Sequence, residues 1–239
     1  MILITRPKEQ SKELKSILVS KGYKNFQESL YNIQYSKKKI FYNENNYYIF
    51  PSIHSVISLV KNKQIHKFKD ANIFAIGKKV KQELIDYGCK KIIATTVDST
   101  SLITILATKK FLKAKFIYLC SDIVNNDFFV KTKKHKISIE KKTIYKTLPV
   151  KKFTNKLIYL LKLNKITGII LYSKLSADTL LSLLKKYRIL PNAKTLHIYC
   201  ISDRVAKPLR KKNFNYVYVA KKPNQKSLIA TIKITHLSQ

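Results

Sequence analysis

The sequence predicts an α/β protein built from two duplicated domains, each with a parallel β-sheet. Two observations lead to this fold class. Short runs rich in β-branched residues alternate with amphipathic helical segments, and the second half of the chain repeats the order of motifs found in the first. The length of 239 residues is enough for two domains of about 120 residues, each able to bury its own core.

The alternation of strands and helices begins at the N-terminus. In the first copy, the apolar runs at residues 1–5, 48–50, 73–76 and 91–94 predict strands. The first helix, predicted over residues 8–20, places Leu14, Ile17 and Leu18 on one face. Strands that alternate strictly with helices form parallel sheets with crossover helices, and such sheets bind ligands beyond the carboxyl ends of their strands.

The internal repeat is carried by three pairs of segments at a nearly constant separation. The segment "IFPSIHSVISLV" corresponds to "ILYSKLSADTLLSLL", "FAIGKKVKQEL" to "YCISDRVAKPL", and "DSTSLITIL" to "NQKSLIATI". The first strand and helix are echoed more faintly by "KFIYLCSDIVNNDFFVKT". Self-similarity over nearly the whole chain predicts a duplicated architecture. The matched positions are Ser52 with Ser173, Gly77 with Ser202, and Ser101 with Ser227.

Small polar residues stand at the carboxyl ends of the predicted strands, at Thr5, Ser52, Gly77, Ser121, Ser173 and Ser202. A serine or threonine there is a common helix N-cap, which is a structural role. The N-terminus of a helix also presents unpaired N–H groups and the positive end of the helix dipole, so it can bind carboxylates or phosphates. The sequence leaves both roles open. Two duplicated domains facing one another would offer such groups to a ligand from both sides.

The formal net charge of +35 predicts attraction to polyanions such as nucleic acid, acidic membranes or a small molecule with many carboxylates. Nearly all of this charge is lysine, because the chain contains only the arginines Arg6, Arg188, Arg204 and Arg210. A solvated lysine surface imposed by A+T-rich codons is the favoured explanation of this charge. The basic runs are scattered and are not interleaved with aromatic residues on one helix, which argues against a dedicated nucleic-acid surface.

Other motifs exclude several classes of protein. The sequence lacks the glycine-rich, metalloprotease and hydrolase signatures, and its five histidines are dispersed, so we expect no metal site and no nucleotide cofactor. Cys89, Cys120 and Cys200 lie far apart in apolar surroundings, which predicts buried free thiols. The opening "MILITRPKEQ" does not resemble a signal peptide, and no apolar run approaches the roughly 20 residues of a membrane span. We therefore expect a cytoplasmic protein.

The order of the motifs resembles that of the uroporphyrinogen-III synthase family. The segments are "ITRP", "AIGKKV", "DSTSL", "IYLCSD", "IYKTLP", "LYSKLSADTL", "CISDRVAKPL" and "VAKKPNQKSLIATI", and together they cover essentially the whole chain. The resemblance implies two α/β domains joined by a two-stranded linker, with the active-site cleft between them. By similarity, domain one comprises residues 1–37 and 150–239, domain two comprises residues 38–149, and the linker strands lie at about 29–37 and 142–149.

The resemblance also implies a lyase that cyclises hydroxymethylbilane, with loss of water and inversion of the terminal pyrrole, to uroporphyrinogen III in heme biosynthesis. It implies no cofactor, a monomer, transient contact with hydroxymethylbilane synthase, and neither a membrane nor a specific nucleic acid as partner. By resemblance, Tyr145 corresponds to the tyrosine that is the family's candidate acid. A phenol with a pKa near 10 remains protonated at neutral pH, so it can donate a proton. The substrate-binding candidates are Thr5, Arg6, Ser52, Ser55, Gly77, Ser101, Ser173, Ser176, Ser202 and Ser227.

The sequence departs from the family pattern at three places. Pro51 replaces a threonine before Ser52, Val80 and Lys81 replace a Thr-Ala pair, and Asp122 stands where an Arg-Gly-like segment is expected. The Asp122 carboxylate would repel substrate carboxylates, whereas backbone N–H groups could bind them whatever the side chains. Two alternatives remain open: a basic nucleic-acid-binding protein, and a catalytically weak relative of the family.

Overall fold

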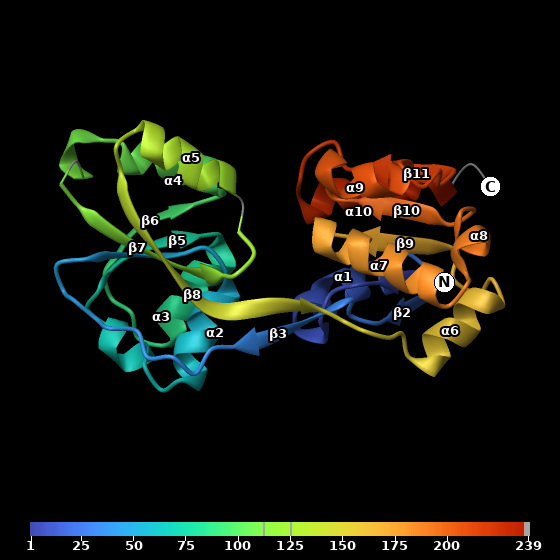
Figure 1. Cartoon of the computed structure of the whole chain (residues 1–239), viewed down its shortest axis with the longest axis horizontal. Helices are drawn as coiled ribbons and strands as arrows, with labels where there is room; N and C mark the ends of the chain where they lie inside the picture. Colours follow the sequence, from blue (N-terminus) through green and yellow to red (C-terminus); the bar gives the residue numbers. More distant parts are fainter. Residues whose placement is uncertain (112, 125, 237–239) are drawn as a thin grey trace. The chain divides into compact units, whose positions relative to one another are not determined.

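The computed structural model describes residues 1–111, 113–124 and 126–236 (Figure 1). The chain divides into two compact units. The first consists of Met1–Asn32 and Leu148–Gln239, and the second of Ile33–Thr147. The chain therefore leaves the first unit once, builds the second unit from one continuous segment, and returns to complete the first.

The first unit contains a five-stranded sheet in the order β11-β10-β9-β1-β2. Its paired strands are parallel. The strands are β1 (Ile2–Ile4), β2 (Asn25–Gln27), β9 (Gly168–Leu171), β10 (His197–Cys200) and β11 (Tyr216–Val219). The helices are α1 (Lys8–Ser20), α6 (Asn155–Lys162), α7 (Lys174–Lys186), α8 (Leu190–Ala193), α9 (Asp203–Arg210) and α10 (Gln225–His236).

Helices cover both faces of this sheet, so its strands are apolar on both sides. Leu3 and Ile169 belong to the core beneath α6, α7 and α9. The neighbouring residues Ile2, Ile4 and Ile170 belong to a second core beneath α1 and α10. This alternation follows from the two-residue period of a strand, in which successive side chains point to opposite faces.

The second unit contains a six-stranded sheet in the order β3-β8-β7-β4-β5-β6. The strands are β3 (Tyr31–Tyr35), β4 (Tyr47–Phe50), β5 (Asn72–Ile76), β6 (Ile92–Thr96), β7 (Lys115–Ser121) and β8 (Ser138–Pro149). The pairs β4–β5, β4–β7, β5–β6 and β7–β8 are parallel. The helices are α2 (Ile53–Lys61), α3 (Lys78–Asp86), α4 (Ser99–Leu106) and α5 (Asn126–Lys134), with short 3₁₀ helices at Ile65–Phe68 and Lys109–Phe111.

The second sheet is also covered on both faces. Tyr48 and Phe50 pack with residues of α2 and α3, while Ile49 and Phe74 pack with α4 and α5 in a separate core. Aromatic rings make up much of the core beneath α4 and α5. Phe74, Phe111 and Phe116 contact one another edge-on there, with ring centroids 5.5 to 6.1 Å apart. Each unit is thus a three-layer arrangement of helices, sheet and helices.

The two sheets place repeated segments in the same order. In the first unit β9, β10 and β11 are successive neighbours, and their sequence counterparts β4, β5 and β6 are successive neighbours in the second. The strand β1 and its counterpart β7 lie on the other side of β9 and β4, respectively. The predicted fold class, α/β with two parallel-rich sheets, is confirmed.

The segment "FQESLYNIQYS" contributes to both sheets. It forms β2, which joins the first sheet, and β3, which joins the second. The break falls near Leu30, which is fully buried in the first unit and whose N–H donates to the carbonyl of Thr5. In the second unit, the 12-residue strand β8 runs through the corresponding region without a break.

The thiols of Cys89, Cys120 and Cys200 are free and buried, as the sequence predicts. In the described part of the chain, none of the helices is both long and apolar enough to cross a membrane.

Candidate functional site

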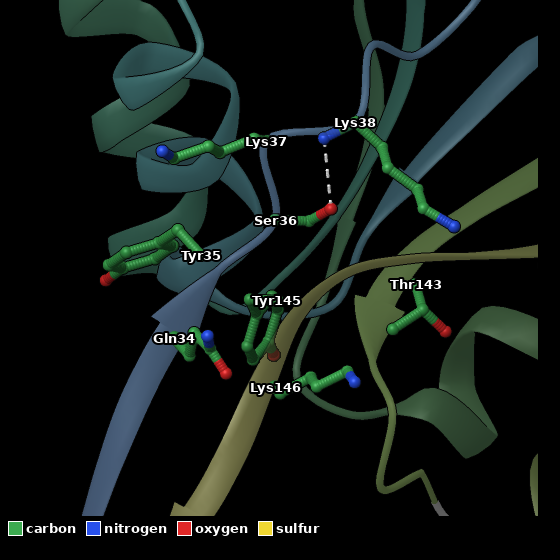
Figure 2. A pocket seen from close by; sticks show the side chains of 8 residues that line it. All are labelled: Gln34, Tyr35, Ser36, Lys37, Lys38, Thr143, Tyr145 and Lys146. Atoms are coloured by element: carbon green, nitrogen blue, oxygen red, sulfur yellow. Dashed lines mark hydrogen bonds between the residues drawn. The ribbon is translucent and has the colours of Figure 1, made fainter.

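A pocket of about 430 Å³ lies in the second unit at the edge formed by β3 and β8. Figure 2 shows the rings of Tyr35 and Tyr145 in this pocket, together with three lysine side chains. The lysines are exposed, so the pocket is positively charged at its opening. Its lining residues are Gln34, Tyr35, Ser36, Lys37, Lys38, Thr143, Tyr145 and Lys146.

Tyr145 comes from the middle of β8 and is only 6% exposed. Burial raises the pKa of its phenol to about 12, although a hydrogen bond with the Ser52 side chain acts in the opposite direction. The phenol therefore keeps its proton throughout the neutral range and can donate it or hydrogen-bond through it. Tyr145 belongs to the lining of the pocket, so its side chain borders the space that a bound molecule would fill.

Ser52 connects Tyr145 to the N-terminus of α2. It is the N-cap of this helix, and its hydroxyl accepts a hydrogen bond from the backbone N–H of His54 at 3.3 Å. The Tyr145 hydroxyl, through its contact with Ser52, thus lies close to the positive end of the α2 dipole. A negative charge that develops on the phenol oxygen would be stabilised there.

His54 and Tyr35 complete this group, and neither is among the site residues predicted from the sequence. The Tyr35 hydroxyl is 2.9 Å from Nδ1 of His54, and the rings of His54 and Tyr145 have centroids 5.6 Å apart. The Nζ of Lys61 lies over the Tyr35 ring, 4.7 Å from its centroid. A signal was available, since His54 follows the Ser52 cap by two residues and Tyr35 lies on the strand preceding the repeat. This signal is weak, because His54 is one of five histidines dispersed along the sequence.

The other predicted residues of the second unit lie outside this pocket's lining. Ser55 is fully buried and its hydroxyl donates to the carbonyl of Leu119 at 2.6 Å. Gly77 precedes α3 with a φ of +97°, a conformation that favours glycine, so the first turn of α3 has no side-chain cap. Ser101 lies in the first turn of α4 and is held by the carboxylate of Asp98 through its N–H and its hydroxyl.

In the first unit, the predicted residues follow the neighbouring strands β1, β9 and β10. Thr5 is fully buried and donates to the carbonyl of Ile170 at 2.6 Å. Ser173 caps α7, and its hydroxyl interacts with both the N–H and the hydroxyl of Ser176. Ser202 stands at the N-cap of α9 but forms no side-chain capping hydrogen bond.

Two further predicted residues lie elsewhere in the first unit. Ser227 is in the first turn of α10, where its N–H donates to Asn224 and its hydroxyl accepts from the N–H of Lys222. Arg6 is half-buried, with the carbon of its guanidinium 3.4 Å from the centroid of the Tyr172 ring. Of the predicted residues, the structure therefore brings Tyr145 together with Ser52, and Ser173 together with Ser176.

Asp122, the departure expected to repel carboxylates, is committed to local structure. Burial raises the pKa of its carboxyl, but hydrogen bonds from the Ser121 hydroxyl and from the N–H groups of Thr147 and Ile123 outweigh this, and the net pKa is lowered. The Thr147 N–H donates to it at 3.1 Å. The carboxylate is therefore ionised, and hydrogen bonds donated by neighbouring groups already stabilise its negative charge.

No group of three or more side chains that could hold a metal ion occurs within residues 1–111, 113–124 and 126–236. The side chains that line the pocket offer phenol, hydroxyl, amide and ammonium groups, and the imidazole of His54 contacts the two phenols. Such groups donate hydrogen bonds and attract anions, so the chemistry that this arrangement supports is proton donation to an anionic molecule.

Comparisons with known proteins agree on one family. The family model described as uroporphyrinogen-III synthase HemD matches residues 12–230. Among solved structures, uroporphyrinogen-III synthetase from Helicobacter pylori aligns with a TM-score of 0.67 and 16% identity over 98% of both chains. A mutant uroporphyrinogen III synthase from Thermus thermophilus aligns with a TM-score of 0.56 and 10% identity over both whole chains. No curated protein was matched.

The structural likenesses are similarities of fold, since their sequence identities are low, whereas the family model spans most of the chain. The resemblance inferred from the order of the motifs is thereby confirmed. The chain belongs to the uroporphyrinogen-III synthase HemD family.

Proposed function

We propose that this protein is a uroporphyrinogen-III synthase, a hydro-lyase that cyclises hydroxymethylbilane to uroporphyrinogen III. The observation that carries the proposal is the buried phenol of Tyr145 on the wall of a lysine-rimmed pocket, in a chain of this family. The substrate carries four acetate and four propionate arms, so it is a polyanion that a net charge of +35 attracts.

The pocket matches one part of the substrate. Ligand pockets range from about 300 to 1,000 Å³, and a volume of about 430 Å³ falls near the small end of this range. A single pyrrole ring with its two carboxylate arms suits such a space better than the whole linear tetrapyrrole does. We therefore assign the pocket to a terminal ring, with the ammonium groups of Lys37, Lys38 and Lys146 near its carboxylates.

Tyr145 is proposed to donate its proton to the departing hydroxyl. The hydroxymethyl C–O bond breaks, the hydroxyl leaves as water, and the chain end becomes an azafulvene. The phenolate that remains is stabilised by the Ser52 hydroxyl and by the N-terminus of α2. The proton that the attacked pyrrole releases when it regains aromaticity restores the phenol, so Tyr145 ends the cycle as it began.

Control of geometry is proposed to be the larger part of catalysis. Hydroxymethylbilane closes without assistance and then gives the uninverted isomer, so the protein must direct attack through the substituted carbon of the far pyrrole. Holding reacting groups in a defined orientation can supply several kcal/mol of the barrier. The hydrogen-bonded strands β3 and β8, which supply most of the pocket's lining, are suited to this role.

Substrate carboxylates are further proposed to bind backbone N–H groups at helix N-termini. In the second unit the candidates are the first turns of α2 and α3, which follow Ser52 and Gly77. In the first unit they are the first turns of α7 and α9, which follow Ser173 and Ser202. Helix N-termini bind anions through these groups and through the dipole, whatever side chain caps them.

The decisive experiment is an isomer analysis. Hydroxymethylbilane is generated by hydroxymethylbilane synthase with and without this protein, and the products are oxidised to porphyrins and separated. We expect the protein to divert the product from type I to type III without an added cofactor. A type I product that saturating protein leaves unchanged would contradict the proposal.

A further inference from the structure

The strand that carries Tyr145 is irregular next to that residue. Cys120 of β7 is paired with Thr143 of β8. The next residue of β7, Ser121, is paired with Tyr145, which leaves Ile144 as an extra residue on β8. An extra residue of this kind is a β-bulge, which bends its strand and changes the direction of the side chains around it. Bulges are frequent beside active sites, where they redirect a side chain.

The bulge accounts for two consecutive buried residues on the same side of β8. In a regular strand, successive side chains point to opposite faces of the sheet. Ile144 and Tyr145 are 1% and 6% exposed, yet both belong to the core that contains residues of α2 and α3. The carbonyl of Ile144 accepts hydrogen bonds from the N–H of Ser36 at 2.9 Å and from the hydroxyl of Ser58 at 2.5 Å. The direction of the Tyr145 ring therefore depends on how this bulge is held.

Asp122 holds β8 immediately after the bulge. It is the first residue beyond the end of β7, and its own N–H donates to the carbonyl of Tyr145 at 3.2 Å. Its carboxylate accepts from the N–H of Thr147 at 3.1 Å. The carboxylate is oriented in turn by the Ser121 hydroxyl, which donates to it at 2.8 Å. The backbone and the side chain of one residue thus fix the two residues of β8 on either side of position 146.

The charge of Asp122 also acts on the Tyr145 phenol. Although burial acts in the opposite direction, hydrogen bonds lower the pKa of the Asp122 carboxyl, so it is ionised at neutral pH. Burial is the main cause of the raised pKa of Tyr145, and the Asp122 carboxylate is a smaller cause in the same direction. The carboxylate therefore helps the phenol to keep its proton until an acceptor is bound.

We propose that Asp122 is a positioning residue, which holds the bulge of β8 so that the Tyr145 side chain stays in the lining of the pocket with its hydroxyl beside Ser52. The inference rests on the proposed function only for the step that Tyr145 performs, which is proton donation to the departing hydroxyl. The carboxylate that the sequence suggested would repel the substrate thus fixes the strand that carries the acid.

The test compares two substitutions of Asp122 in the whole protein. Asp122→Asn keeps a side-chain oxygen that can accept from the Thr147 N–H and removes the charge, whereas Asp122→Ala removes both. The rate of type III formation from freshly generated hydroxymethylbilane is expressed per folded protein. The dissociation constant of uroporphyrin I, which has eight carboxylates and cannot be turned over, is measured by fluorescence.

We expect Asp122→Ala to lower the rate at least about tenfold, because a misplacement of about 1 Å can cost about 10²-fold in rate. Asp122→Asn should stay close to the wild-type rate, because it can keep the hydrogen bond to β8. Both variants should bind uroporphyrin I as tightly as the wild type or more tightly, because each has lost a negative charge. Asp70→Ala, which removes an exposed carboxylate of the same unit, is the matched control and should leave the rate unchanged.

A wild-type rate in Asp122→Ala would overturn the proposal. An equal loss of rate in both variants would also overturn it, because the charge of Asp122 and not its hydrogen bond would then be responsible. Loss of uroporphyrin I affinity in parallel with the rate would show a damaged pocket and would likewise contradict a role limited to placing Tyr145.

Hydrogen exchange of the wild type gives a reading that needs neither turnover nor a variant, so it decides the question even if Asp122→Ala does not fold. The Thr147 N–H should be protected at neutral pH, because the Asp122 carboxylate accepts it. Exchange as fast as that of an exposed amide would refute the proposal even if the protein makes the type III isomer. Protection of Thr147, with a Tyr145 ring resonance that moves in Asp122→Ala but not in Asp122→Asn, would support the positioning role. In a protein that makes no type III isomer, the same result would contradict only the proposed function.

Discussion

Replacing Tyr145 by phenylalanine removes one oxygen from the wall of the pocket in the second unit. The ring stays in place, because it belongs to the buried core of the second unit and contacts the His54 ring, so we expect the fold to be retained. The Ser52 hydroxyl keeps the hydrogen bond from His54, which limits the loss of stability to about 1 kcal/mol. Proton donation contributes about 10²- to 10⁴-fold in general, and a leaving group as labile as this one places the loss at about 10²-fold or less.

A loss of 10²-fold corresponds to about 2.7 kcal/mol of transition-state stabilisation. The assay follows formation of the type III isomer from freshly generated hydroxymethylbilane, while uroporphyrin I binding reports whether the pocket is intact. Tyr216→Phe, which changes an exposed tyrosine of β11, is the matched control and should retain the wild-type rate. An unchanged rate and isomer ratio in Tyr145→Phe would refute the assignment of the acid.

Three further predictions concern stability and charge. Ser55→Ala removes the hydroxyl that donates to the buried carbonyl of Leu119, so it should lower the free energy of unfolding by about 1 to 2 kcal/mol. Urea unfolding measures this as a lower midpoint, and an unchanged midpoint would contradict the prediction. Burial raises the pKa of Cys120 and Cys200 from 9 to about 12. Above pH 9 the unfolded chain therefore binds fewer protons than the native protein, so stability should fall between pH 9 and 12, on the order of 1 kcal/mol per pH unit for each thiol. Urea unfolding at pH 8 and pH 10 measures this, and Cys200→Ala should show a smaller difference than the wild type. Binding to nucleic acid should be unspecific and should weaken steeply with salt, and discrimination between sequences at physiological salt in a filter-binding assay would disprove this.

Local patterns were sufficient for the elements and for the class of fold. The helix predicted over residues 8–20 coincides with α1, because the spacing of its apolar residues and the proline before it are both local signals. The Ser52 and Ser173 caps are local for the same reason, since each hydroxyl bonds to an N–H two or three residues further along the chain. Duplication was visible because equivalent segments keep the same order, and it accounts for the matching strand order of the two sheets.

The candidate site depended on pairings that no local pattern contains. Tyr145 lies far along the chain from Tyr35 and Ser52, and they meet only because β8 is hydrogen-bonded to β3 and the α2 N-terminus comes up beside it. Arg6 and Tyr172 are likewise distant in sequence and meet because β1 pairs with β9. A shift of one residue in such a register would turn each side chain to the opposite face of its sheet, so only the assembled sheets decide which polar groups share a pocket.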